Sequence, residues 1–137
     1  MDFRQRPERK IMVVTYNEDL VQVLAKDVGR ILRSAGYKRL FPRTRLQSDA
    51  QSLTRVTTTS NGSVFFTSFG STMTGLGADY IIFDDPIQAS RVTSAAQRDA
   101  VDGLIKYIAT TRANTPKTAR VLLLMQRCLT SAPTGQI

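Results

Sequence analysis

The sequence predicts an α/β fold in which helices cover a parallel β-sheet. Apolar runs at residues 11–15, 80–83 and 121–125 have the composition of strands, and they alternate with two stretches of helical periodicity. Between them, two segments rich in Thr, Val and Phe flank Asn61-Gly62, where a positive φ is inexpensive. The order strand, helix, hairpin, strand, helix, strand therefore favours one layered domain, with the hairpin at about residues 53–69 as an insertion.

The first strand leads directly into the first helix. Asn17 suits the cap, and apolar residues then recur at three- and four-residue spacing as far as Gly36, where we expect the helix to stop. Residues 37–52 have no clean period, and Pro42 disfavours helix at the residue before it, so a crossover loop is expected. Its expected apolar anchors are Leu40, Phe41 and Leu46.

The second helix has a clear start and end in the sequence. Ser94 and Gln97 have the spacing of a capping box, and the apolar stripe ends before Asn114. The run VLLLM at 121–125 is expected to be a strand buried on both faces, like the run at 80–83.

Composition limits the chemistry. The chain has 137 residues, 42% of them hydrophobic, which suits one compact domain. It has one cysteine and no histidine, so a disulfide framework, a four-thiolate zinc site and a histidine-based triad are excluded. No apolar run approaches the roughly 20 residues of a membrane span, and we expect no membrane partner.

Positive charge is concentrated in the first third of the chain. The net charge is +8, and residues 1–46 hold 11 of the 19 Lys and Arg. This half either faces a polyanion such as nucleic acid or forms a solvated surface behind a basic N-terminal arm at 1–10. Arg43 and Arg45 are the candidate contacts to a nucleic-acid backbone, with an exposed basic loop as the alternative.

The most informative local motif is YIIFDDP at residues 80–86. Ligands of open parallel sheets sit at the carboxyl ends of strands, where two carboxylates can hold a hard cation. In a nucleotide site, Asp84 would orient Mg²⁺ and Asp85 would polarise the water that attacks the γ-phosphate. The alternative is that an aspartate caps the following turn. A metal nuclease that also uses Asp79 is disfavoured, because side chains alternate along a strand.

Two other segments bear on a nucleotide site. Gly70 and Gly75 have the glycine spacing of a phosphate loop, but Leu76 and Gly77 replace its Lys and Ser/Thr, so a flexible turn beside the site is expected instead. Gln126 and Arg127 follow the last strand as Asp84 follows the previous one. They can sense a γ-phosphate, or Arg127 can form a salt bridge with an aspartate.

Several segments, in this order, resemble the large terminase subunits of tailed bacteriophages and prophages. They are VVTYNEDLVQVLAKDVGRIL (13–32), LFPRTRL (40–46), TTTSNGSVFFTSFGSTMTG (57–75), GLGADYIIFDDP (75–86) and VLLLMQR (121–127). The resemblance implies a P-loop NTPase-type core that uses ATP and Mg²⁺ to pump double-stranded DNA into procapsids in the bacterial cytoplasm. The implied protein partners are a small terminase subunit and a portal protein.

The same resemblance assigns site residues and shows departures. Asp84 resembles the Walker B metal residue, Asp85 the catalytic carboxylate, and residues 125–127 the coupling segment. The family carries a phosphate loop before the equivalent of residue 11 and a nuclease domain after its ATPase core. An arginine common in the family is replaced by Leu76.

We therefore expect a piece of such a protein, from a truncated or split gene or an artificially shortened chain. Residues 11–127 would form a partial ATPase core and 128–137 a tail. We do not expect the isolated chain to be catalytically complete, which leaves open whether it is an enzyme. A separate chain can supply the phosphate loop. The alternative function is a non-enzymatic basic DNA-binding or assembly module.

Overall fold

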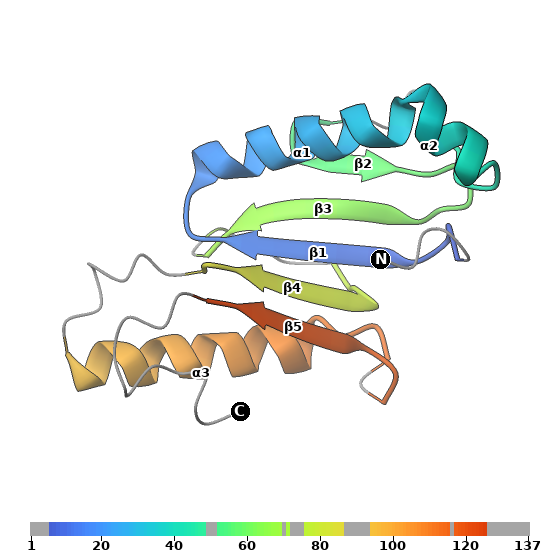
Figure 1. The fold of residues 1–137 in the computed structure, drawn as a ribbon. Coiled ribbons are helices and arrows are strands. Elements are labelled where there is room, and N and C mark those ends of the chain that lie inside the picture. The colour runs from blue at the N-terminus through green and yellow to red at the C-terminus, as the bar shows by residue number, and fades with distance from the viewer. Residues whose placement is uncertain are drawn as a thin grey trace.

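A five-stranded sheet with three helices forms the fold of this computed structural model, which describes residues 6–48, 52–69, 71, 76–86, 94–115 and 117–125 (Figure 1). The elements are β1 (Lys10–Thr15), α1 (Glu18–Arg33), α2 (Ala35–Leu40), β2 (Arg55–Thr57), β3 (Ser63–Ser68), β4 (Tyr80–Asp84), α3 (Ala95–Thr111) and β5 (Arg120–Leu124). The strand order is β2-β3-β1-β4-β5, with β2 antiparallel to β3 and the other four strands parallel. The predicted α/β class is confirmed.

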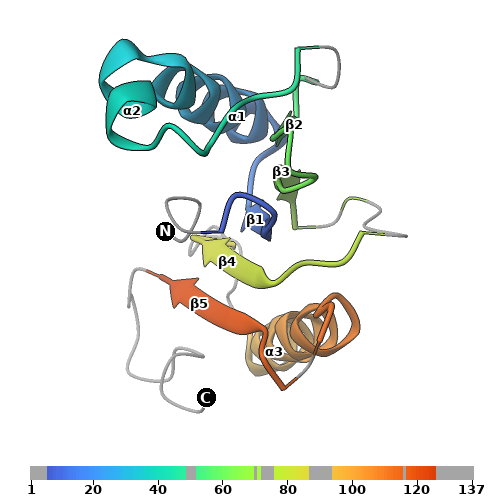
Figure 2. The same cartoon turned by 90° about the vertical axis from the view of Figure 1, so that its right-hand side faces the viewer.

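Helices cover both faces of the sheet. Along β1, Ile11 and Val13 pack with α1, whereas Met12 and Val14 pack with α3. This alternation is the expected result of side chains pointing to opposite faces of a strand. Figure 2 shows the sheet between α1 and α2 on one side and α3 on the other. The largest fully buried side chain, Phe83, lies in the cluster under α3.

The hairpin forms as predicted, but it is not an insertion. Asn61 has φ 61°, and the backbone N–H of Thr58 donates to Gly62 O at 2.8 Å, which closes the predicted turn. However, β3 pairs along its whole length with β1 and is an inner strand of the main sheet. The physical reason is that β3 has apolar side chains for both layers, because Val64 packs with the α1 cluster and Phe65 with the α3 cluster.

The predicted helix stop at Gly36 and the loop beyond it are wrong in part. The first helix ends at Ser34, whose hydroxyl accepts a hydrogen bond from the Tyr37 N–H at 3.2 Å and so caps α2. Gly36 lies inside α2, and Leu40 is 68% exposed instead of being an anchor. Phe41 is the cap residue after α2 and lies outside the helix, which agrees with the prediction that Pro42 disfavours helix at the residue before it.

The C-terminal half matches the predicted elements but not the predicted burial. Ser94 and Gln97 form the capping box, and α3 ends at the cap residue Arg112. The strand β5 forms, yet Val121, Leu122 and Leu124 are about half exposed.

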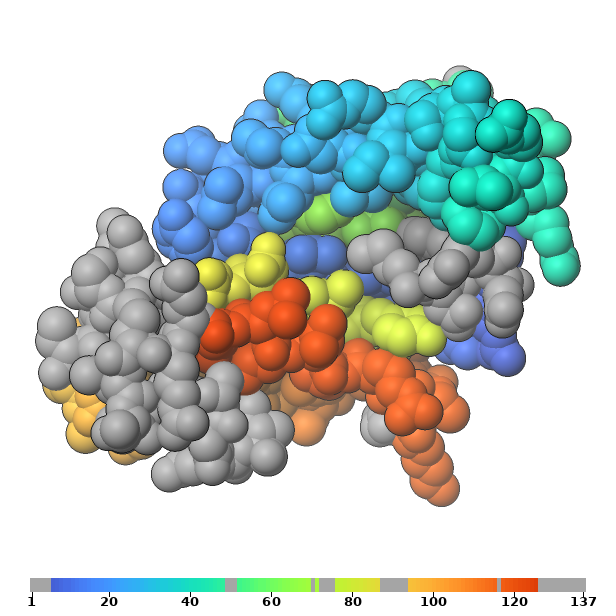
Figure 3. All heavy atoms as spheres, in the orientation of Figure 1, coloured from blue at the N-terminus to red at the C-terminus, as the bar shows by residue number. Residues whose placement is uncertain are grey.

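The exposure of β5 has a structural reason. This strand is at the edge of the sheet, and on the face that carries Leu122 and Leu124, α1 packs mainly over β3, β2 and β1 at the far side. Figure 3 accordingly shows the side chains of β4 and β5 at the surface below α1. No helix among the described residues has the length and apolar character needed to cross a bilayer.

Candidate functional site

Three inner strands end in polar residues at the same edge of the sheet. In the parallel register, Thr15 of β1 lies between Ser68 of β3 and Asp84 of β4. On the other side of Asp84, the register partner in β5 is Leu124. Figure 1 shows the four parallel arrowheads pointing toward this edge. Open α/β sheets bind ligands at the carboxyl ends of their strands, so this edge is the candidate site.

Alternation along β4 places the Asp84 side chain on the α1 side of the sheet. Ile81 and Phe83 pack in the cluster under α3, whereas Ile82 packs against the cluster under α1. The next residue on the α1 side is Asp84. The same alternation puts Thr15 on that side, two residues after Val13. The N-terminal end of α1, capped by the Asn17 side chain, follows at the same edge.

The Asp84 carboxylate is available for a cation. Asp84 is half-buried, and within the described residues its side chain makes no hydrogen bond or ion pair. Those residues also contain no group of three or more acidic, cysteine or histidine side chains that could hold a metal. A cation at Asp84 would therefore take most of its oxygen ligands from water or a substrate, as Mg²⁺ commonly does.

Asp85 directly follows β4 and has a left-handed backbone conformation. Its φ is 41°, its backbone N–H donates to Leu124 O at 2.9 Å, and the next residue, Pro86, is buried. Aspartate tolerates this left-handed conformation better than most residues. Asp85 is exposed, whereas Asp84 is half-buried, so the two carboxylates have different surroundings.

Asp79 has a structural position at the opposite end of β4. Its carboxylate accepts hydrogen bonds from the Lys10 backbone N–H at 2.8 Å and from Asn114 Nδ2 at 3.3 Å, and Arg9 lies 3.7 Å away. Asp84 lies five positions after Asp79, which is about 16 Å along a strand at 3.3 Å per residue. The hypothesis of a nuclease centre that joins Asp79, Asp84 and Asp85 is therefore wrong for the described residues.

The described end of the glycine-rich segment, residues 76–78, does not lie beside the candidate site. The N–H of Ala78 donates to Arg112 O at 2.7 Å, at the amino edge of the sheet, and a Cβ at Gly77 would overlap Asn114 Oδ1. The expectation is wrong there because this segment crosses from the carboxyl end of β3 to the amino end of β4. Gly70 and Gly75 lie outside the described residues.

The remaining predicted site residues divide into two groups. Gln126 and Arg127 lie outside the described residues. Arg43 and Arg45 belong to the segment after α2; Arg45 O accepts a hydrogen bond from the Thr59 N–H in the hairpin. That hairpin turn precedes β3, so these arginines lie toward the amino edge, away from Asp84.

Sequence patterns did not single out Arg33 or Lys38, which the fold brings to the same hollow as Arg45. These two residues belong to different helices and are not part of a motif. Their spacing along the chain shows only two basic residues near helix ends. The signal that would have identified them is their shared position around one pocket, which the sequence does not contain.

Comparison with known proteins adds no family assignment. No protein-family model matches the chain, and no curated protein sequence matches it at a significant level. The structure itself establishes an α/β fold with a five-stranded, mostly parallel sheet.

Proposed function

We propose that this chain is part of the ATPase core of a phage or prophage terminase large subunit. Such a core has the P-loop NTPase fold and drives double-stranded DNA into procapsids with a small terminase subunit and a portal protein. The observation that carries the proposal is Asp84, a carboxylate at the carboxyl end of an inner parallel strand that has no partner among the described residues. The ordered resemblance of five segments to terminases supports it further.

The residues at the candidate site suit Mg²⁺ and ATP. Asp84 offers a hard oxygen ligand, and the neighbouring strand ends contribute Thr15 and Ser68. When bound, Mg²⁺ would neutralise charge on the β- and γ-phosphates. Asp85, exposed on its turn, would orient and polarise the attacking water. Gln126 and Arg127 would sense the γ-phosphate and couple it to movement.

Residues outside this sequence would complete the site. The 137 residues contain no G-x-x-x-x-G-K-[ST] loop, so the backbone amides and the lysine that grip phosphates would come from elsewhere. The position of β5 supports this part of the proposal. It is an edge strand with exposed Val121, Leu122 and Leu124, whereas edge strands are usually protected by charge, proline or a covering segment.

An ATPase assay tests whether the chain alone is incomplete. The purified chain is expected to show no steady ATP hydrolysis with Mg²⁺, because phosphate positioning accounts for most of the catalysis in this class. Asp85→Asn, which preserves the tolerance of left-handed backbone, is the companion variant. Steady hydrolysis by the native chain that disappears in Asp85→Asn would show that the site is already complete.

A cation-binding experiment tests the role of Asp84 directly. Paramagnetic Mn²⁺ is expected to broaden the amide resonances of residues 15–17 and 84–85, because those segments meet at the carboxyl edge. Asp84→Asn should abolish this broadening, whereas Asp99→Asn, which removes an exposed acid on α3, should leave it intact. Broadening that persists in Asp84→Asn would contradict the assignment.

A second candidate function is a non-enzymatic basic module that binds DNA or assists assembly. The observation that favours it is the 11 of 19 basic residues in the first 46 positions. Binding of duplex DNA should then weaken with salt along a log-log line whose slope reflects the number of neutralised phosphates. Absence of binding at low salt would eliminate this function.

A further inference from the structure

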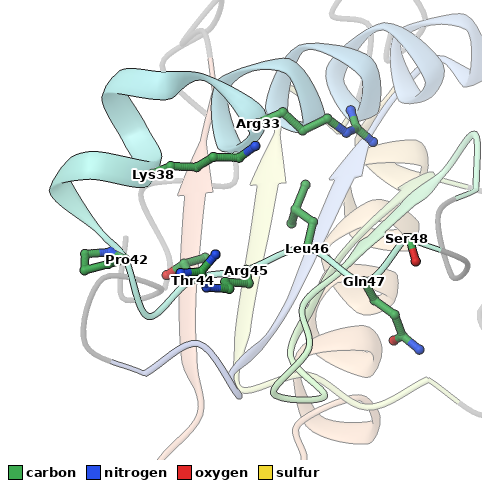
Figure 4. Close-up of a pocket in the computed structure, with 8 residues that line it drawn as sticks. All are labelled: Arg33, Lys38, Pro42, Thr44, Arg45, Leu46, Gln47 and Ser48. Atoms are coloured by element: carbon green, nitrogen blue, oxygen red, sulfur yellow. The ribbon is translucent and has the colours of Figure 1, made fainter.

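A basic hollow lies beside α2, away from the carboxyl edge of the sheet. It has a volume of about 390 Å³ and receives Arg33 from the last turn of α1, Lys38 from α2 and Arg45 from the segment that follows. Figure 4 shows Lys38 extending from α2 toward the stem of Arg33, with Leu46 pointing up between the loop and α1. Lys38 and Arg45 thus come to one space from two separate segments, and Arg33 borders it with a guanidinium that lies back along α1, where Nη1 is 2.8 Å from the Cβ position of Gly29.

These cations have no opposing charge among the described residues that line the hollow. Within the described residues, the ion pairs are Arg9 with Asp79 and Arg30 with Asp27, so none of the three hollow cations is in one. Like charges gathered in one place repel each other, and a bound anion would remove that repulsion.

The remaining lining suits a phosphate more than a base or an apolar ligand. Ser48 adds a hydroxyl group, and none of the described residues that line the hollow has an aromatic side chain to stack on a base. Arginine forks match phosphate oxygens in a bidentate geometry, and lysine adds a point charge. Contacts of this kind position a nucleic-acid backbone without reading its sequence.

We propose that this hollow is a phosphate-binding site that takes a phosphodiester of a nucleic-acid backbone. The site comprises Lys38 and Arg45 with the neighbouring Arg33, and Ser48 as a neutral partner. It does not depend on the nucleotide chemistry proposed for Asp84, because it lies toward the opposite edge of the sheet. Arg43, two residues from Arg45, does not line the hollow and provides a matched control.

Fluorescence anisotropy with a labelled duplex oligonucleotide tests the assignment on the full chain. The native chain should bind at low salt, and Arg33→Gln, Lys38→Gln and Arg45→Gln should each weaken binding and lower the salt slope by about one. Arg43→Gln removes the same charge outside the hollow and should have a clearly smaller effect. Equal weakening by all four variants would overturn the proposal, because it would indicate only a diffuse basic surface.

A second measurement separates a backbone phosphate from a free one. Inorganic phosphate should shift the amide resonances of residues 44–48 saturably, and Arg45→Gln should remove the shift while Arg45→Lys retains most of it. Far-ultraviolet circular dichroism melts establish that each variant is folded. Saturable phosphate binding without duplex binding would overturn the backbone assignment in favour of a small phosphate ligand. No response to either probe would overturn the site itself.

Discussion

Asp84 lies directly opposite Thr15 in the parallel register of β4 and β1, at the edge where both strands end. At the other end of β4, Asp79 is bound to the backbone N–H of Lys10, the first residue of β1. Asp79 is thus held by hydrogen bonds at one end of this pair of strands, whereas Asp84 at the other end has no side-chain partner among the described residues. We assign the first to stability and the second to ligand binding.

This difference predicts opposite effects on stability. Asp79→Ala should lower the free energy of unfolding by about 1–2 kcal/mol, because it leaves the Lys10 N–H without its acceptor. Asp84→Ala should change it by no more than about 0.5 kcal/mol, because no pairing is lost. Urea denaturation followed by circular dichroism measures both values. Equal losses would show that Asp84 is structural too.

The turn after β4 predicts an order of tolerance at Asp85. Because its φ is 41°, Asp85→Val should destabilise the protein by about 1–2 kcal/mol more than Asp85→Asn does. Thermal denaturation of the two variants provides the comparison. If the valine variant were as stable as the asparagine variant, this would contradict the left-handed backbone conformation of Asp85.

Two glycines should respond in opposite directions to alanine. A Cβ at Gly62 would overlap the carbonyl oxygen of Pro7 and lie 2.8 Å from that of Arg9, so Gly62→Ala should cost about 1–3 kcal/mol. Gly103 lies within α3 with no atom within 4 Å of its Cβ position, and Gly103→Ala should add about 0.5–1 kcal/mol. Chemical denaturation measures both changes. A stabilising Gly62→Ala would disprove the close packing of Pro7 on the hairpin turn.

The exposed edge strand predicts self-association of the isolated chain. Leu122→Thr and Leu124→Thr together should reduce the mass measured by light scattering at high protein concentration, because they remove apolar surface from an open edge. Leu123→Thr is the contrasting variant, since Leu123 packs against the cluster under α3 and its loss should lower stability instead. An unchanged mass in the double variant would show that β5 is not the contact.

Features that depend on nearby residues were predictable from sequence. The Asn17 and Ser94 caps and the Asn61-Gly62 turn all formed, because each relies on hydrogen bonds or backbone preferences within a few positions. The strand run that ends at Asp84 formed for the same reason, since an unbroken apolar segment suits a sheet buried on both faces. The carboxyl-edge position of Asp84 then followed from the parallel topology.

Which strands and side chains become neighbours was decided only by the tertiary structure. Whether β3 lies inside the sheet and β5 at its edge depends on which surfaces can be covered by segments far along the chain, and the apolar pattern of each strand is compatible with either place. The position of Arg33, Lys38 and Arg45 around one hollow depends on the break at Ser34, which redirects the chain into α2. The sequence by itself determined the local elements and the acidic strand end, whereas long-range packing decided that this end and the basic hollow lie apart.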